Sequence, residues 1–426
     1  MSPSSDPAQH AHTRPDAARD PGSGDRGSSA PGSRAAAPPV SPVLLIVGLF
    51  LVALNLRAAM ASVPPVLSAI EAEVGLGGFG AGLLTALPVL CMSVFAPTAH
   101  RLAHRIGREA AVAVALTVLG IGLGARLAGA HVVPLFGGTL LAGFGIAVLG
   151  VVLPGIVREF FPHHPGAATG AYVTGLAFGA SVAAAFAVPL EECLGSWQAS
   201  LATWAGLALV AGAAWMPVVL RANEHESAEE SHRGRLPWRS ATAWLVSLYL
   251  GVQSFLFYSE LAWIAPAYES AGWDPGDAGL LLSAFMLIQL VAGLGVPALA
   301  DLTPDRRPWF LLVVACILLG LLAMLAWPET MPWLFVAVLG FGQGGAFAMG
   351  LLLLVDHART PEDSGRLSAM AFLVSYLVAA CGPAVVGGLR DATDGFDVPW
   401  AVLLVLAVVQ VPLVVQFSPA RRARGI

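Results

Sequence analysis

Residues 43–66 read VLLIVGLFLVALNLRAAMASVPPV, an apolar run interrupted by Asn55, Arg57 and Ser62, with two prolines near its end. A helix needs about 20 mostly apolar residues to cross the hydrocarbon core of a bilayer, so this run is long enough to span one. It is also too long for the apolar core of a secretory signal. Residues 1–40 are instead rich in Pro, Ser, Gly and Ala, a composition that predicts a disordered tail.

Apolar runs of this kind recur along the chain and predict an all-α polytopic membrane protein. Hydrophobic residues make up 57% of the sequence and charged residues 12%, whereas a soluble domain carries about 25% charged residues. We therefore expect lipid to cover most of the folded chain. Neither the net charge of -5 nor the distribution of basic residues indicates nucleic-acid binding. The runs predict twelve transmembrane helices, at 43–66, 80–99, 109–130, 133–157, 166–190, 198–220, 241–266, 276–299, 308–327, 331–355, 365–390 and 398–417.

The arginines, which are the only basic residues besides histidine, predict the orientation. Arg126 and Arg390 fall in loops on one side of the membrane, and Arg57 falls within the first span. All the other arginines fall in the tails and loops of the opposite side. Because basic residues concentrate in cytoplasmic loops, this distribution predicts that both termini are cytoplasmic and that the number of spans is even.

The chain also contains an internal repeat. The sequence AGLL at 81–84 recurs at 278–281, and GFG at 143–145 recurs at 340–342, each at an offset of 197 residues. A Leu-Ala pair after each AGLL helix repeats at the same offset. The repeat predicts two pseudo-symmetric six-helix bundles related by an axis along the membrane normal. The predicted boundaries are a cytoplasmic tail at 1–40, bundles at 41–220 and 241–418, a cytoplasmic linker at 221–240 and a short tail at 419–426.

Residues 100–109, HRLAHRIGRE, resemble the cytoplasmic loop motif of the major facilitator superfamily, Gly-x-Leu-Ala-Asp-Arg-x-Gly-Arg-Arg/Lys. Arg105, Gly107 and Arg108 match the motif, His104 replaces its aspartate, and the second half keeps the acidic residue as Asp301. The resemblance implies that these charges pair with neighbouring helix ends and help to hold an outward-open state. The first half lacks the acidic member of that arrangement.

Further segments resemble the cyanate permease / 2-nitroimidazole transporter family of the same superfamily. They are LNLRAAMASVPPVL from Leu54, LLTALPVLCMSVFAP from Leu83, SFLFYSELAWIAP from Ser254, GFGQGGAFAMGLLLL from Gly340 and GRLSAMA from Gly365. This resemblance implies a secondary transporter that works by alternating access around a site near the bilayer midplane. It also implies a small anionic or nitro-aromatic solute and a bacterial cytoplasmic membrane.

Arg57 is the leading candidate for contact with substrate. An arginine within a span costs about 2.5–3.5 kcal/mol on insertion scales, so its side chain should face the interior of the bundle or a wet cavity. Its planar guanidinium can hold an anionic or nitro-bearing solute through two parallel hydrogen bonds. The alternative is a permanent ion pair or a contact with a backbone carbonyl that fixes the first helix. Asn55 is a second candidate, although it points to another side of the helix.

The seventh span offers a second polar face, with Gln253, Phe257 and Glu260 at helical spacing. Counting from the proline near the end of each helix places Arg57 opposite Tyr258. We therefore hypothesise that Arg57 and Glu260 pair in the empty protein, and that substrate or a proton breaks the pair. The alternative is that Glu260 is a carboxylate near the membrane surface.

Gln343 in the tenth span and Tyr376 in the eleventh complete the predicted substrate site. The string GFGQGG around Gln343 mimics a dinucleotide-binding loop, but it lies inside a spanning helix, where small residues allow close helix packing. We predict no cofactor, no metal site and no catalytic residues. A membrane enzyme, a sensor without flux and an exporter of other drug-like molecules are the alternatives. We expect a monomer in lipid that binds a small molecule.

Overall fold

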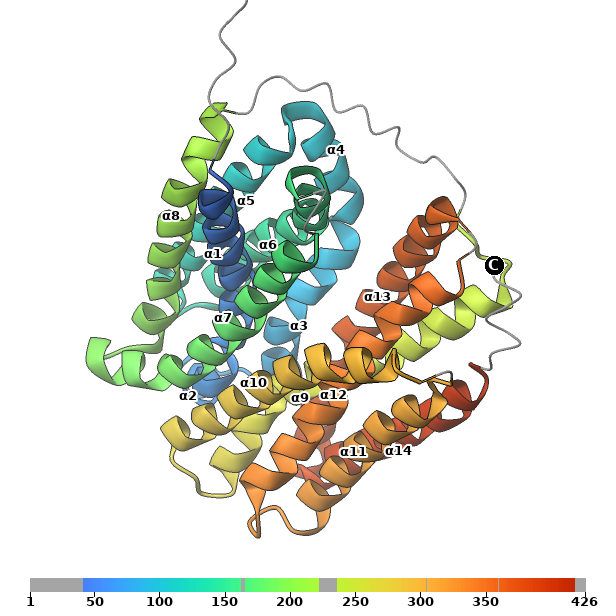
Figure 1. Cartoon of the computed structure of the whole chain (residues 1–426). Helices are drawn as coiled ribbons and strands as arrows, with labels where there is room; N and C mark the ends of the chain where they lie inside the picture. The colour runs from blue at the N-terminus through green and yellow to red at the C-terminus, as the bar shows by residue number, and fades with distance from the viewer. Residues whose placement is uncertain (1–40, 162–164, 222–235, 304, 359, 418–426) are drawn as a thin grey trace, which may run out of the picture. The chain divides into compact units, whose positions relative to one another are not determined.

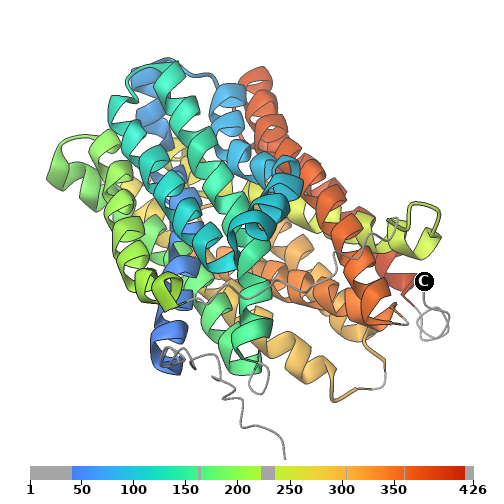
Figure 2. The same ribbon diagram turned by 90° about the horizontal axis from the view of Figure 1, so that it is seen from above.

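The computed structural model describes residues 41–161, 165–221, 236–303, 305–358 and 360–417, which form helices and short connections (Figure 1). The first half contains α1 (Pro42–Ala61), η1 (Pro64–Val66), α2 (Leu67–Val74), α3 (Gly78–Val94), α4 (Ala96–Ile106), α5 (Arg108–Ala125), η2 (Arg126–Ala128), α6 (Val132–Phe160), α7 (Pro165–Leu194) and α8 (Trp197–Arg221). The second half contains α9 (Ala241–Ser270), α10 (Pro275–Ala300), α11 (Arg307–Ala326), α12 (Pro332–Asp356), α13 (Pro361–Thr393) and α14 (Asp397–Val415). Within the first half, α1 packs against α7 and α8 (Figures 1 and 2).

The predicted fold class is confirmed. Eleven helices in the described ranges are long and apolar enough to cross a membrane, and there are twelve when α3 and α4 count as one bent span. The predicted tails at 1–40 and 419–426, and most of the predicted linker at 221–240, lie outside the described residues.

The prediction that residues 100–109 form a loop is wrong. The second span breaks at Phe95, and a new helix, α4, continues to Ile106 after a bend of 56°. Pro97 lies in the first turn of α4, where the missing backbone N–H is not needed for a helical hydrogen bond. Gly107 then ends the helix at a φ of 85°, a conformation that favours glycine. The motif is therefore a short helix followed by a glycine turn.

The internal repeat corresponds to the same helix crossing in both halves. Gly143 of α6 packs against Pro88 of α3, where an added Cβ atom would lie 3.2 Å from the Cα atom of Pro88. Gly340 of α12 packs against Phe285 of α10, where an added Cβ would lie 2.8 Å from the carbonyl oxygen of Phe285. Positions 340 and 285 lie 197 residues after positions 143 and 88, so the second crossing is equivalent to the first. Small residues therefore recur because each half brings two helix backbones together at this point.

Arg126 does not lie in a water-facing loop as predicted, because its side chain is 1% exposed. It begins η2, and its guanidinium donates weakly to the carbonyl oxygen of Ala59 (3.5 Å) and to the hydroxyl of Thr139 (3.4 Å). Ala59 belongs to the last turn of α1, whose carbonyl groups carry partial negative charge. Arg126 is therefore placed to stabilise the end of the helix that carries Arg57.

The two halves are joined at the end of the helices remote from the start of α1. Asp391 near the end of α13 accepts hydrogen bonds from the backbone N–H groups of Gly78 (2.8 Å) and Phe79 (3.0 Å), where α3 begins. Arg390, which the sequence placed in a loop, forms an ion pair with Glu71 of α2 at 2.7 Å. We call Glu71, Gly78, Phe79, Arg390 and Asp391 the distal junction. A carboxylate at a helix N-terminus is favourable, so Asp391 stabilises contact between the halves.

Replacing Asp391 with asparagine should loosen the distal junction. Asparagine keeps one acceptor oxygen, but the second hydrogen bond and the negative charge at the N-terminus of α3 are lost. This loss is worth about 1 kcal/mol, so the fraction of molecules with an open junction should rise about fivefold. The buried contact between the hydroxyl groups of Ser181 and Ser283, 2.6 Å apart across the halves, provides the readout. A cysteine at position 283, in a protein whose four native cysteines are replaced by serine, should react faster with a maleimide when the junction opens.

Asp394→Asn is the matched control for Asp391→Asn. Asp394 carries the same charge at the same end of the molecule, and its side chain is exposed. Its backbone has a φ of 52°, which asparagine tolerates well. Equal labelling rates in the two variants would contradict a role for Asp391 in holding the halves together.

Candidate functional site

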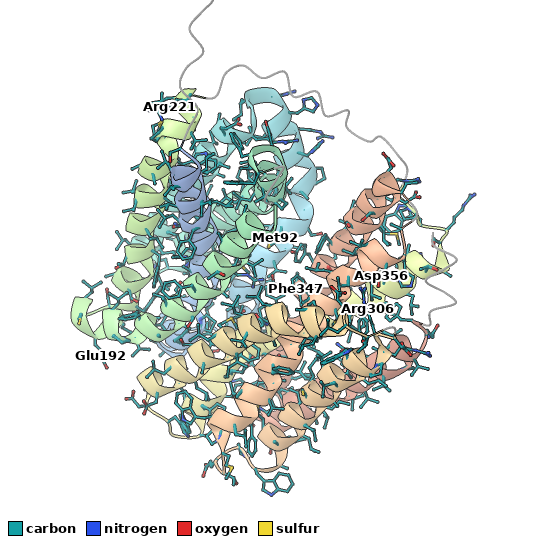
Figure 3. All side chains as sticks on the ribbon, viewed as in Figure 1. Met92, Glu192, Arg221, Arg306, Phe347 and Asp356 are labelled. Carbon is teal, nitrogen blue, oxygen red and sulfur yellow. The ribbon has the colours of Figure 1, made fainter. Side chains whose placement is uncertain are left out.

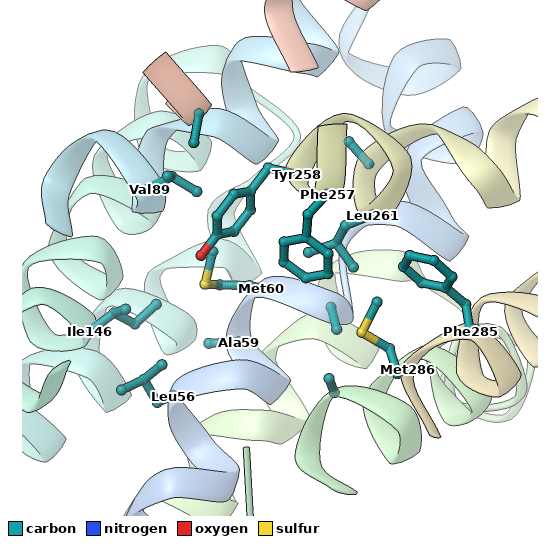
Figure 4. Packing of buried hydrophobic residues seen from close by; sticks show 14 of the residues in the cluster. Leu56, Ala59, Met60, Val89, Ile146, Phe257, Tyr258, Leu261, Phe285 and Met286 are labelled. Carbon is teal, nitrogen blue, oxygen red and sulfur yellow. The ribbon is translucent and has the colours of Figure 1, made fainter. Parts of the chain in front are cut away.

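Arg57 lies between the two halves, against aromatic rings of α9. The carbon of its guanidinium lies 5.2 Å from the ring centre of Phe257 and 5.7 Å from that of Tyr258. Figure 4 shows these two rings packed beside Ala59 and Met60 of α1, with the Tyr258 hydroxyl directed towards Met60. Among the described residues, Arg57 has no hydrogen bond and no ion pair. Its five N–H donors therefore have no partner in this part of the protein.

Tyr376 of α13 and Tyr172 of α7 belong to the same site. Both phenol groups lie within range of the charge of the Arg57 guanidinium, and both side chains are partly exposed. The structure thus brings the predicted residues Arg57, Tyr258 and Tyr376 together. Tyr172 was missed by the sequence analysis. The available signal was the scarcity of tyrosine, since the chain has only five.

Glu260, Gln343 and Gln253 form a second, fully buried polar group between α9 and α12. The Gln343 amide donates to one Glu260 oxygen at 2.9 Å, and the Gln253 amide donates to the Gln343 oxygen at 3.1 Å. The Ser254 hydroxyl extends the chain by donating to Gln253 at 3.3 Å. The second oxygen of Glu260 has no hydrogen-bond partner in the described structure. Glu260 is 0% exposed, so it is not a carboxylate that faces water.

The predicted ion pair between Arg57 and Glu260 is not formed in this structure. Glu260 points towards α12 and is held by Gln343, whereas the adjacent turn of α9 presents Phe257 and Tyr258 to Arg57. Residues on one helix that face different neighbours cannot meet the same partner without a rotation of the helix. The two charged side chains therefore occupy separate environments on the two sides of α9.

Asn55 does not join Arg57, as its position on another side of the helix predicts. Its side-chain amide donates to the carbonyl oxygens of Leu51 in α1 (2.9 Å) and Leu207 in α8 (3.2 Å). The side chain is 1% exposed. Because Asn55 and Arg57 are two residues apart, they point to different sides of the helix. In this structure, Asn55 links α1 to α8.

The residues of the repeated motif form ion pairs within each half. In the first half, Arg108 pairs with Glu159 of α6 at 2.8 Å, and the side chain of Arg105 is exposed. In the second half, Arg306 bridges Asp301 and Asp356, both at 2.5 Å, at the ends of α10 and α12. Figure 3 shows Arg306 and Asp356 side by side. Glu159 thus supplies an acidic partner that the motif of the first half lacks.

These features define a multi-pass membrane carrier, in which spanning helices enclose a charged centre that both halves line. The sequence profile of the Major Facilitator Superfamily matches residues 45–383, and the chain belongs to this superfamily. It is a transporter and not an enzyme.

The predicted resemblance to cyanate and 2-nitroimidazole transporters is also confirmed. The chain is 35% identical to the uncharacterized transporter YycB of Bacillus subtilis (strain 168), over 86% of this chain and 90% of that protein. It is 32% identical to the 2-nitroimidazole transporter of Escherichia coli (strain K12), over 86% of this chain and 93% of that protein. It is 29% identical to the cyanate transport protein CynX of the same organism, over 88% of this chain and 98% of that protein.

Solved structures share the fold at much lower identity. The crystal structure of a D-xylose-proton symporter matches with a TM-score of 0.73 at 14% identity, and covers 90% of this chain and 99% of that chain. An inward-facing structure of a bacterial homolog of the human lysosomal transporter Spinster matches with a TM-score of 0.69, also at 14% identity, and covers 90% of this chain and 97% of that chain. Both comparisons confirm the fold.

Proposed function

We propose that this secondary transporter moves a small anionic or nitro-heterocyclic solute across the bacterial cytoplasmic membrane by alternating access. Both termini lie in the cytoplasm, and the protein works as a monomer. The 2-nitroimidazole and cyanate transporters among its relatives support this class of solute. The arginine distribution supports the orientation.

The environment of Arg57 carries the proposal. A cation in a membrane interior normally pairs with an acidic group or with backbone carbonyls. Arg57 has neither among the described residues, and lies instead against the faces of Phe257 and Tyr258. A cation–π contact uses none of the guanidinium N–H groups in a hydrogen bond, so these donors remain available to a bound anion. We infer that the solute supplies the missing partner.

The distal junction supports an inward-open conformation. Asp391 and Arg390 join the halves at the end of the helices remote from the start of α1. With cytoplasmic termini, this end faces outwards, and we infer that the route to Arg57 opens to the cytoplasm. Alternating access would then require the distal junction to break whenever the site opens outwards.

Glu260 is the proposed coupling residue. It is fully buried, and one of its oxygens has no hydrogen-bond partner in the described structure. An unpaired carboxylate is costly in a membrane interior, and uptake of a proton removes that cost. We therefore propose that Glu260 binds and releases a proton during the transport cycle. Its hydrogen bond to Gln343 transmits the change in protonation to α12.

Arg57→Gln tests the proposed site. The protein, purified in detergent, is screened by thermal shift against small anions and nitro-heterocycles, and hits are assayed for uptake into reconstituted vesicles. Loss of charge-assisted hydrogen bonds worth about 1.5–3 kcal/mol each should weaken binding by roughly ten- to a hundredfold. Arg57→Lys keeps the charge but loses the planar two-pronged contact, so its affinity should be intermediate.

Arg101→Gln provides the control, because Arg101 is an exposed arginine of α4 at a position that the loop motif does not specify. It should bind every hit as the wild type does. Unchanged binding and uptake in Arg57→Gln would show that Arg57 is structural and would refute the proposal. Binding without accumulation in vesicles would instead favour a sensor over a transporter.

A further inference from the structure

The five tyrosines of the chain divide into two groups by their hydroxyl partners. Tyr249 donates to the carbonyl oxygen of Ala346 at 3.0 Å, and Tyr268 donates to that of Pro328 at 3.3 Å. The other three, Tyr172, Tyr258 and Tyr376, have no hydrogen-bond partner among the described residues. A tyrosine hydroxyl in a protein interior usually finds a partner, so three open hydroxyls in one place require an explanation.

All three open hydroxyls belong to residues that surround Arg57. Tyr258 lies beneath the guanidinium, and the phenols of Tyr172 and Tyr376 lie within range of its charge. Tyr172 comes from α7 in the first half, whereas Tyr258 and Tyr376 come from α9 and α13 in the second. The site therefore combines one cation with three neutral hydrogen-bond donors from both halves. This donor set suits a ligand with at least two anionic or polar oxygens.

The walls of the site are aromatic as well as polar. Phe257 lies under Arg57 and is stacked on Phe285 of α10, with ring centres 6.3 Å apart and planes 16° apart. Tyr376 is stacked on Phe372 of the same helix at 5.8 Å and 18°. These rings present faces and edges that favour offset stacking with another flat ring.

We propose that Tyr172, Phe257, Tyr258 and Tyr376 make the Arg57 site selective for flat aromatic anions and their nitro analogues. This inference rests on the proposed function, since it assumes that Arg57 binds the solute. The guanidinium carbon lies over the rings of Phe257 and Tyr258, so an anionic group approaches from the side that these rings leave open. A carboxylate or nitro group conjugated to an aromatic ring then holds that ring in the plane of the guanidinium, beside the tyrosines. A linear or puckered anion cannot make the same ring contacts.

Benzoate and cyclohexanecarboxylate test this selectivity, because they share a charge and a similar size but only benzoate is flat. Binding of each to the purified full-length protein is measured by calorimetry. Stacking of the benzoate ring against the aromatic side chains of the site should favour benzoate about tenfold in the wild type. Phe257→Leu keeps an apolar side chain without a ring and should reduce this preference to about threefold or less.

Tyr172→Phe separates the role of the hydroxyl from that of the ring. It should weaken the binding of both ligands by roughly three- to tenfold, because a hydrogen bond is lost. The ratio of the two affinities should stay unchanged, because the ring is kept. Tyr268→Phe removes a hydroxyl that is already bound to Pro328, and it should leave both affinities unchanged. Loss of affinity in Tyr172→Phe beside unchanged affinity in Tyr268→Phe supports the inference.

Equal affinity for benzoate and cyclohexanecarboxylate in the wild type would overturn the inference, and so would failure of both to bind. In either case, the proposed function stands if other anions bind to the wild type and are lost in Arg57→Gln. Selective binding of benzoate that survives in Arg57→Gln would refute the proposed site itself. The two failures are therefore distinguishable.

Discussion

Replacing Glu260 with glutamine is expected to abolish concentrative uptake while solute exchange across the membrane continues. Glutamine resembles the protonated acid in shape and charge and can still accept a hydrogen bond from Gln343. The variant is therefore fixed in a neutral state and carries no proton. A proton gradient of one pH unit is worth about 1.4 kcal/mol, or about tenfold accumulation, and the variant should lose this driving force.

Two assays in reconstituted vesicles provide the measurement. The first is net uptake at several external pH values, and the second is exchange (counterflow) into vesicles that already contain the solute. Wild-type uptake should rise as the external pH falls, because protonation of Glu260 from outside becomes more frequent. Uptake by Glu260→Gln should not depend on pH. Glu192→Gln is the control, since Glu192 is an exposed carboxylate near the end of α7, and uptake by this variant should keep the wild-type pH dependence. If Glu260→Gln accumulated solute with the wild-type pH dependence, Glu260 would not be the coupling residue.

Replacing Gly387 with alanine is expected to prevent the distal junction from closing. Gly387 of α13 crosses Gly78 of α3 so closely that an added Cβ atom would overlap the Gly78 carbonyl oxygen. Backbone cannot move aside as a flexible side chain can, and overpacking of this kind costs about 1–3 kcal/mol. Uptake should fall about tenfold or more, because the inward-open state becomes rare. Labelling of a cysteine at position 283 should increase at the same time.

Gly388→Ala is the matched control on the neighbouring residue. An added Cβ atom there meets only the side chain of Phe79, at 3.6 Å, which is an ordinary van der Waals contact. The loss of glycine flexibility is the same in both variants, so only the crossing distinguishes them. Equal uptake by Gly387→Ala and Gly388→Ala would show that close contact between α3 and α13 is not needed in the cycle.

The sequence by itself determined the membrane class, the spans and the superfamily. Twenty-residue apolar runs predict spanning helices because lipid leaves no other way to satisfy the backbone. The 197-residue repeat followed from the same rule of packing, since a glycine is needed wherever two helix backbones cross closely. Arg57 could be singled out because a lone charge in an apolar run is costly wherever the helix packs. These are local properties, which a linear pattern records.

Only the tertiary structure decided which polar groups meet. Glu260 and Arg57 are suitable partners by charge and depth, yet the rotation of α9 directs Glu260 to Gln343 and Phe257 to Arg57. Tyr172 joins the site through the packing of α7, which no spacing along the chain reveals. Arg126 is buried at the end of α1, although the sequence placed it in a loop. Hydropathy fixes the depth of a residue in the membrane, but the rotation of each helix is fixed by contacts with its neighbours.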